Sequence, residues 1–170
     1  HTGIVFQDPA SSLNPRLPIG ESIGEPMLLA GVAKGEELHR RVEDLLDSVE
    51  LPRSYRNRYP HELSGGQRQA VAIGRAVAWA KKVIILDEPT NHLGARQANE
   101  VLNIIRNAKA KGLGVIFISH TLPHVLEITD RIVVLRLGRI VKDAPTSEFN
   151  GDTLIGTITG TIQTIKVEGD

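Results

Sequence analysis

The stretch HELSGGQRQAVAIGRAVAWAKKVIILDEPTNHLG, residues 61–94, decides the fold class of this 170-residue chain. Ser64 followed by Gln67 has the form of a capping box, which predicts that a helix begins there. The run VIIL at 83–86 has no polar alternation, as is typical of a strand covered on both faces of a parallel sheet. The stretch therefore predicts a helix followed directly by a buried strand.

The segments after this strand repeat the alternation of strand and helix. VIFI at 115–118 and IVVL at 132–135 also lack polar alternation, and we interpret both as buried parallel strands. The stretch between 83–86 and 115–118 has helical spacing of apolar residues and ends at Gly112. The side chains predicted to face inward from this helix are Val101, Ile104, Ile105 and Ala108. A strand, a helix and a strand in this order form a βαβ unit, so the predicted fold class is α/β with a parallel sheet.

The C-terminal part is predicted to add a short helix and a hairpin. A helix over 121–129 leads to the strand at 132–135, and LGRIVKDA at 137–144 is typical of its hairpin partner, turning at Gly138. The final stretch, 149–170, is rich in threonine, glycine and isoleucine and lacks a core pattern. We expect it to form an added strand pair or an extended end.

The N-terminal part is predicted to consist mainly of loops and helices. GIVF at 3–6 is typical of a short strand, which the prolines and serines that follow would end. Apolar residues recur at helical spacing from Glu36 to Val49, and Pro52 stops this helix. The helix that begins at Ser64 is predicted to place one apolar face inward, made of Ala70, Val71, Gly74, Val77 and Ala78.

Composition excludes several classes of function. The chain has 20 basic and 20 acidic residues and only 4% aromatic residues, so neither net charge nor a stacking platform indicates a nucleic-acid partner. We interpret the cluster of Arg53, Arg56 and Arg58 around two tyrosines as a solvated loop face rather than a nucleic-acid patch. Cysteine is absent, which excludes thiolate metal sites and is compatible with a reducing compartment. The apolar runs are too short to span a bilayer.

Two features could carry chemistry. Asp87 and Glu88 follow a strand at its carboxyl end, where parallel sheets bind ligands. One carboxylate there suits Mg²⁺, and the other could polarise an attacking water, with His120 from the next strand beside them. Acids and histidines also end strands simply because the chain reaches solvent, so both interpretations stay open. Gly65 and Gly66 leave bare N–H groups at the positive end of a helix, which predicts a phosphate site.

Four motifs in the sequence resemble those of ATP-binding cassette (ABC) proteins. ELSGGQRQAVAIGRAVA resembles their signature motif, and VIILDEPT resembles their Walker B strand with its catalytic glutamate. IVFQDP is similar to their Q-loop, and VIFISHTLPHV is similar to their switch-histidine strand. Because the four motifs occur in the family's order between positions 4 and 125, the chain is identified as a member of that family, except in its final stretch.

The resemblance implies a P-loop NTPase (RecA-like) core half with a parallel sheet, plus the ABC α-helical subdomain. Residues 1–79 would hold the Q-loop and the helical subdomain with the signature motif. Residues 80–148 would form the C-terminal part of the catalytic core, with Walker B, D-loop and H-loop. Residues 149–170 would be a tail of uncertain structure.

The resemblance also implies a role for each motif residue. Asp87 would hold Mg²⁺, Glu88 would be the general base, and His120 would contact the γ-phosphate of ATP. Gln7 would touch the Mg²⁺ and the attacking water and would couple the site to a membrane partner. The residues that would grip the γ-phosphate of ATP bound by the opposite subunit of a head-to-tail dimer are Ser64, Gly65, Gly66 and Gln67.

The sequence departs from the family pattern in several places. Neither GxxxxGKS nor GxxxxGKT occurs in the 170 residues, so the family's phosphate cradle and its lysine are missing. The D-loop ends in Gly94, where many members have aspartate. PASSLNPRLPIGESIGEPMLLAG resembles peptide importers, whereas AVAWAKKVIILDEPT and HTLPHVLEITDRIVVLRLGRIV look like simple-sugar importers. A divergent natural member and an engineered recombinant are both compatible with this mixture.

The expected function is that of a partial ATP-binding and hydrolysing subunit of an ABC importer, which takes up a small solute such as a peptide or a sugar. ATP and Mg²⁺ are the expected cofactors. The expected partners are a second ABC ATPase subunit and a transmembrane permease, with no nucleic acid. The expected location is cytoplasmic, peripheral on the inner face of the plasma membrane.

Two alternatives belong to other classes of function. The chain could be a catalytically inert fragment or engineered module that presents the signature motif without hydrolysing ATP. A role in translation or DNA repair ranks last, because nothing in the sequence resembles the long insertions of those ABC members. The chain begins HTGIVFQ, without an initiator methionine, and we expect it to be part of a longer protein.

The resemblance also bears on packing. The family's N-terminal β-subdomain and cradle helix have no counterpart in this sequence, so at least one face of the sheet should be uncovered. We therefore expect dimerisation or marginal stability, unless the final stretch covers that face.

Overall fold

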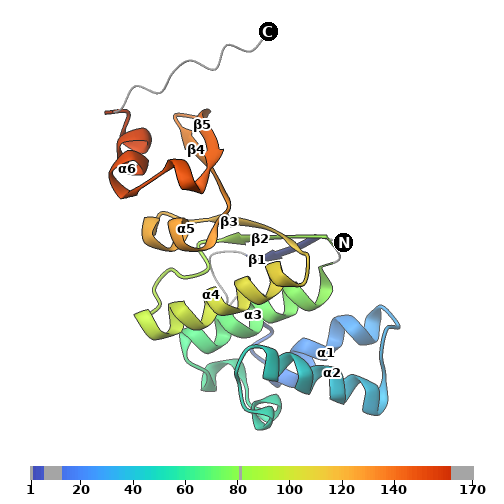
Figure 1. Cartoon of the computed structure of the whole chain (residues 1–170). Helices are drawn as coiled ribbons and strands as arrows, with labels where there is room; N and C mark the ends of the chain where they lie inside the picture. The colour runs from blue at the N-terminus through green and yellow to red at the C-terminus, as the bar shows by residue number, and fades with distance from the viewer. Residues whose placement is uncertain (1, 6–12, 81, 162–170) are drawn as a thin grey trace. The chain divides into compact units, whose positions relative to one another are not determined.

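A computed structural model describes residues 2–5, 13–80 and 82–161 of the chain, and these residues fall into two compact units divided between Ile118 and Ser119 (Figure 1). In chain order the elements are β1 (Thr2–Val5), α1 (Ile19–Leu29), α2 (Gly35–Ser48), η2 (Arg53–Asn57), η3 (Pro60–Glu62), α3 (Gly65–Trp79), β2 (Val83–Asp87), α4 (Ala95–Ala110), β3 (Gly114–Ile118), α5 (Leu122–Ile128), β4 (Arg131–Arg136), β5 (Arg139–Pro145), η4 (Thr146–Glu148) and α6 (Gly151–Thr159). None of the helices within these residues is long and apolar enough to cross a membrane.

The first unit is built on a three-stranded parallel sheet in the order β1-β2-β3. Ile85 of β2 lies opposite Ile4 of β1 and opposite Ile116 of β3. Helix α4 connects β2 to β3, which confirms the predicted βαβ unit. The strand predicted at 3–6 is confirmed as β1, and its predicted end at Phe6 lies outside the described residues.

One face of this sheet is covered by α3 and α4, which lie side by side (Figure 1). Ile84 and Leu86 of β2 are fully buried, at 0% exposure. All four inward residues predicted for α4 are buried. The buried face of α3 differs slightly from the predicted one. Ile73 and Ala76 are buried, whereas Ala78 is exposed.

Helices α1 and α2 pack against each other, and α2 also packs against α3. The predicted helix from Glu36 to Val49 is confirmed as α2, with Val42, Leu45 and Leu46 buried. A Cβ added to Gly74 of α3 would lie 2.6 Å from Cγ1 of Val49, closer than side-chain carbons approach. Glycine at this position therefore allows α3 to pack closely against the end of α2.

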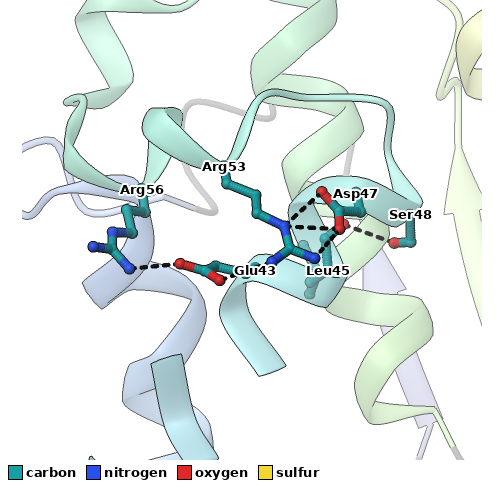
Figure 2. A network of polar contacts seen from close by, with 6 residues as sticks. All are labelled: Glu43, Leu45, Asp47, Ser48, Arg53 and Arg56. Atoms are coloured by element: carbon teal, nitrogen blue, oxygen red, sulfur yellow. Dashed lines mark hydrogen bonds and ion pairs between the residues drawn. The ribbon is translucent and has the colours of Figure 1, made fainter. Parts of the chain in front are cut away.

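An ion-pair network joins α2 to the short helix η2 (Figure 2). The Arg53 guanidinium lies 2.6 Å from an Asp47 carboxylate oxygen and 3.1 Å from Glu43, and Arg56 lies 2.6 Å from the other Glu43 oxygen. The hydrogen bond from Arg53 lowers the pKa of Asp47. The guanidinium of Arg58 lies 3.9 Å from the ring centroid of Tyr55. Carboxylates of α2 pair with Arg53 and Arg56. The network therefore favours the interpretation of the cluster as a solvated loop face rather than a nucleic-acid patch.

The second unit contains an antiparallel hairpin, β4 and β5, which packs against α6. The predicted turn at Gly138 is confirmed, since Leu137 and Gly138 have φ values of 49° and 75°. The prediction of a buried parallel strand at 132–135 is wrong. Ile132 and Val134 are buried, but Val133 is 47% exposed. Alternate residues of the run IVVL thus lie on a buried and an exposed face of the hairpin. Because the exposed residues are also apolar, the sequence lacks the apolar–polar alternation that is typical of a half-buried strand.

The expectation of a strand pair or extended end in the final stretch is also wrong for the part that is described. Helix α6 begins after Asn150, whose side chain accepts a hydrogen bond of 2.8 Å from the N–H of Thr153. Leu154 is the main core residue of α6, at 1% exposure. Threonine and glycine have low helix propensity, and the cap together with this burial overrides it. Residues 162–170 lie outside the described part of the chain.

The second face of the three-stranded sheet has exposed apolar side chains, as we expected from the sequence. The prediction that the strand at 115–118 is parallel is confirmed, but the prediction that it is buried is wrong. Ile116 is 50% exposed and Ile118 is 48% exposed, whereas Val115 and Phe117 of the same strand are half-buried on the helical face. Within the described residues of the first unit, no helix covers this second face (Figure 1).

We predict that this face drives self-association. Replacing Ile116 and Ile118 together with threonine removes apolar surface but keeps β-branched residues in the strand. Sedimentation velocity over a range of concentrations should show less association for the double variant than for the original chain. Val115→Thr is the matched control, since it should lower stability without reducing association. Equal association of the original chain and the double variant would contradict the prediction.

The Arg53 network predicts an acid-sensitive contribution to stability. The pKa of Asp47 is lower in the folded chain than its ordinary value of 3.8, so its contribution is present above that value and lost as the pH falls below it. Arg53→Gln should therefore lower the urea midpoint at neutral pH, and the difference from the original chain should shrink below about pH 3. Arg16→Gln, at an exposed arginine outside this network, controls for general charge effects. A difference that does not change with pH would exclude the Asp47 contribution.

Candidate functional site

Helix α3 begins with the capping box predicted from the sequence. The N–H of Gln67 donates to Ser64 Oγ at 3.2 Å, and the N–H of Ser64 donates to Gln67 Oε1 at 3.0 Å. Ser64 and Gly65 are exposed, so the start of α3 is open to solvent. The helix has 15 residues, long enough for its N-terminus to present a positive end of the helix dipole.

The two glycines at the start of α3 have different surroundings. No heavy atom other than those of its chain neighbours and its own helix lies within 4 Å of a Cβ added to Gly65. A Cβ added to Gly66 would lie 2.7 Å from both Cβ and Cγ of Gln97, and Gly66 is buried. The sequence predicts a phosphate site at both glycines. A side chain at position 65 would meet open space at an exposed helix start, whereas packing against α4 is enough to explain Gly66.

The carboxylate pair lies at the carboxyl end of β2, as predicted. Asp87 is the last residue of the strand and is half-buried, while Glu88 is 8% exposed. The N–H of Glu88 donates to the carbonyl oxygen of Ile118 at 2.9 Å, which ties the residue to the end of β3. Glu88 has a φ of 49°, in the left-handed region that is unfavourable for residues other than glycine. Strain of this kind, held in place by a sheet, is a common feature of functional sites.

The loop after Glu88 leads directly into α4. The N–H of Asn91 donates to the carbonyl oxygen of Glu88 at 3.1 Å, and Thr90 is buried at 5% exposure. Gly94 is the N-cap of α4 and has a φ of −66°, which any residue can adopt. A Cβ at this position would lie 2.7 Å from Oε1 of Gln97. Because Oε1 is the far end of a flexible side chain, the aspartate common in the family could be accommodated at Gly94 by a small movement.

Two further predicted site residues, His120 and Gln7, are not described together with the others. His120 is exposed and belongs to the second unit, whereas Asp87, Glu88 and the SGGQ segment belong to the first. Gln7 lies outside the described residues. The structure therefore describes the signature and Walker B segments within one unit, and the roles given to all of these residues stay predictions.

The chemistry of the Asp87 carboxylate fits the expected Mg²⁺ ion. Mg²⁺ commonly binds to proteins through one or two carboxylates and completes its shell with waters and substrate phosphates. Within the described part of the chain, no group of three or more histidine, aspartate or glutamate side chains is arranged to hold a metal ion. A single carboxylate is thus compatible with a Mg²⁺ ion that arrives with a nucleotide.

Gln97 lies near these segments, and the sequence does not mark it as a site residue. It lies in the first turn of α4, and its side chain occupies the space that a side chain at Gly66 or Gly94 would need. Its position three residues after the N-cap is the only local signal, and that signal indicates helix capping. Its contact with Gly66, thirty-one positions earlier in the chain, exists only because α3 packs against α4.

Comparisons with known proteins agree with the motifs. The family model described as "ABC transporter" matches residues 1–91, slightly more than half of the chain. The chain is 38% identical over 151 residues to a putative peptide import ATP-binding protein of Brucella abortus (strain 2308), covering 88% of this chain and 45% of the relative. It is 43% identical over 148 residues to the oligopeptide transport ATP-binding protein OppF of Bacillus subtilis (strain 168), covering 86% of this chain and 48% of OppF.

Two further similarities extend this result. The chain is 41% identical over 143 residues to the glutathione import ATP-binding protein GsiA of Pectobacterium atrosepticum, covering 84% of this chain and 23% of GsiA. Among solved structures it is similar to a dimeric ATP-binding cassette in a post-hydrolysis state bound to ADP and Pi, with a TM-score of 0.74, 29% identity, and coverage of 85% of this chain and 62% of that one. The similarity supports the predicted α/β fold of the P-loop NTPase class. The chain spans about half the length, or less, of these curated relatives.

The conformation of Glu88 gives a testable prediction about stability. Glu88→Gly and Glu88→Ala both remove the carboxylate, but only glycine adopts a positive φ without steric cost. We expect the glycine variant to be more stable than the alanine variant by about 1 kcal/mol in urea unfolding. At Asn99, an exposed residue within α4, the same pair of substitutions should rank in the reverse order. Equal ranking at the two positions would mean that Glu88 is not held in the left-handed conformation.

Proposed function

The chain belongs to the ABC transporter family, and on that premise we propose that it provides the signature and Walker B segments of an ATP-binding subunit that powers peptide import. The observation that carries the peptide assignment is the identity of 38% and 43% to two peptide transport ATP-binding proteins, over more than four fifths of this chain. The glutathione import relative, whose substrate is itself a small peptide, agrees with this choice. The alternative of a sugar rests on the sequence resemblance of the C-terminal part alone.

The start of α3 would bind the γ-phosphate of a nucleotide held by the opposite subunit. The open surroundings of Gly65 support this role, because the residue is exposed at the helix start and no neighbouring side chain lies beside its Cα. Ser64 is exposed beside it. The hydrogen bond from the N–H of Gln67 holds the hydroxyl group of Ser64 at the helix start, where the ligand would bind. A head-to-tail pair of subunits would bring this helix start to a cradle supplied by the partner.

The end of β2 would act on the nucleotide of the subunit itself. Asp87 would hold the Mg²⁺ that accompanies ATP, and bound Mg²⁺ would neutralise charge on the phosphates. Glu88 would accept a proton from the attacking water, and its backbone hydrogen bond to Ile118 would keep the carboxylate in place. Gln7 and His120 would contact the Mg²⁺ and the γ-phosphate, as the family resemblance implies.

The proposed partners are a second ABC ATPase subunit and a transmembrane permease. The dimeric state of the similar solved cassette supports the first, and the transport names of the relatives support the second. In this role the protein would lie in the cytoplasm, on the inner face of the plasma membrane. We further propose that residues 1–79 contain the helical subdomain, 80–148 part of the catalytic core, and 149–170 an appended tail.

The second candidate function is that of a catalytically inert module. It is favoured by one observation, the absence of GxxxxGKS and GxxxxGKT from the 170 residues. Without the backbone cradle and the lysine of this motif, the chain alone lacks the groups that hold the β- and γ-phosphates. Such a module could present SGGQ to a partner and still leave its own Glu88 without a nucleotide.

Complementation tests the proposed role of SGGQ. A full-length ABC subunit that has the cradle motif, but whose own signature serine is replaced with arginine, should hydrolyse ATP slowly. We expect the addition of this chain to raise that hydrolysis several-fold, because its SGGQ completes the site of the partner. The Ser64→Arg chain should give no increase. The Glu88→Gln chain should still raise hydrolysis, because Glu88 would act at the site of its own subunit and not at the site that SGGQ completes.

Calorimetry tests the inert alternative. If the chain is a catalytically inert module, Mg-ATP should not bind tightly to the chain alone or to its Glu88→Gln variant. Micromolar binding to the chain alone would mean that it has a phosphate cradle of its own, which would contradict the inert alternative. No increase in hydrolysis in the complementation assay would contradict the proposed function.

A further inference from the structure

The side chain of Gln97 fills the space that two glycines leave open. A Cβ on Gly66 would lie 2.7 Å from both Cβ and Cγ of Gln97, and a Cβ on Gly94 would lie 2.7 Å from its Oε1. Contacts below 3.0 Å are essentially never made by real Cβ atoms. Gly66 and Gln97 therefore form a matched pair, in which the absence of one side chain makes room for the other.

The two contacts differ in rigidity. Gly66 meets Cβ and Cγ of Gln97, and the position of Cβ is determined by the backbone of α4. Gly94 meets Oε1, which can move by rotation about the side-chain bonds. The stem of Gln97 therefore sets the distance between α3 and α4 near Gly66, while its amide group adapts to the chain around Gly94.

The residues in contact belong to the two segments of the proposed site. Gly66 lies in the first turn of α3, directly after Ser64 and Gly65. Gly94 ends the loop that begins at Glu88, and Gln97 lies one turn further along α4. All of them belong to the first unit, where α3 and α4 run side by side (Figure 1).

We propose that Gln97 is a positioning residue that fixes the start of the SGGQ helix relative to the loop after Glu88. In this arrangement Gly65 faces the ligand and Gly66 is a packing position. The importance of the fixed register rests on the proposed function, in which SGGQ acts on the nucleotide of the partner and Glu88 acts on that of its own subunit. Gln97 then makes the two segments move as one rigid body.

A stability series tests the contact itself. Gly66→Ala is made in three backgrounds: the original chain, Gln97→Ala, which removes Cγ, and Gln97→Gly, which removes both clashing carbons. The increase in the unfolding equilibrium constant caused by Gly66→Ala should be more than tenfold with Gln97, smaller with alanine, and absent with glycine at position 97. If the first variant does not fold, folding should return in the Gln97→Gly background. The same penalty in all three backgrounds would overturn the proposal.

Gly65→Ala is the matched control for this series. Because the space around Gly65 is open, its effect on unfolding should be the same in all three backgrounds. A dependence on residue 97 as large as that of Gly66→Ala would mean that Gln97 does not act through Gly66, which would overturn the proposal.

A binding measurement distinguishes positioning from mere packing. Inorganic phosphate is titrated against the folded chain, and the amide resonance of Gly65 is followed by NMR. Gln97→Ala should raise the dissociation constant at least threefold, and Gln97→Met, which keeps Cβ and Cγ, should restore the original value. Equal affinities in the original chain and Gln97→Ala would overturn the positioning role.

The two measurements separate this inference from the proposed function. If phosphate does not shift the Gly65 resonance in the original chain, the proposed role of SGGQ is contradicted. A graded stability series would still support Gln97 as the residue that sets the register of α3 and α4 in that case.

Discussion

The close packing of α3 is the constraint on which the first unit depends. This helix contacts α2, α4 and the sheet, and it approaches two of them through glycines. Gly66 meets the stem of Gln97 on α4, and Gly74 meets Val49 at the end of α2. Between them Val71 and Ile73 are completely buried. Any side chain at either glycine would separate the helices and expose this core, so the requirements of packing set the position of the SGGQ segment.

The same scaffold holds a strained residue at the other segment of the site. Glu88 has a left-handed backbone and follows directly from a strand that is paired on both sides. Its N–H is bound by the carbonyl oxygen of Ile118, so the hydrogen bonds of the sheet extend one residue beyond β2. The cohesion of the sheet and helices compensates for the steric cost of this conformation. In the proposed function, the result is a carboxylate with little freedom to move away from the water that it would activate.

Local signals predicted most of the elements but not the environment of each. The capping box at Ser64 and the inward face of α4 depend on neighbours within one or two turns, and both are confirmed. The strand at 132–135 was misassigned because an exposed Val133 looks like a core residue in the sequence. Helix α6 was missed because its composition is poor in helix-forming residues, while burial of Leu154 against the hairpin stabilises it.

The sequence by itself determined the family, most of the strands and helices, and the segments that would carry the chemistry, because each depends on residue types at short spacing. The SGGQ cap and the Asp87–Glu88 pair could both be named without coordinates. Only the tertiary structure distinguished Gly65 from Gly66 and revealed the contact of Gly66 with Gln97. The physical reason is that a glycine signal is the same whether a ligand or a side chain fills the space, and which of them does so depends on helices brought together by folding.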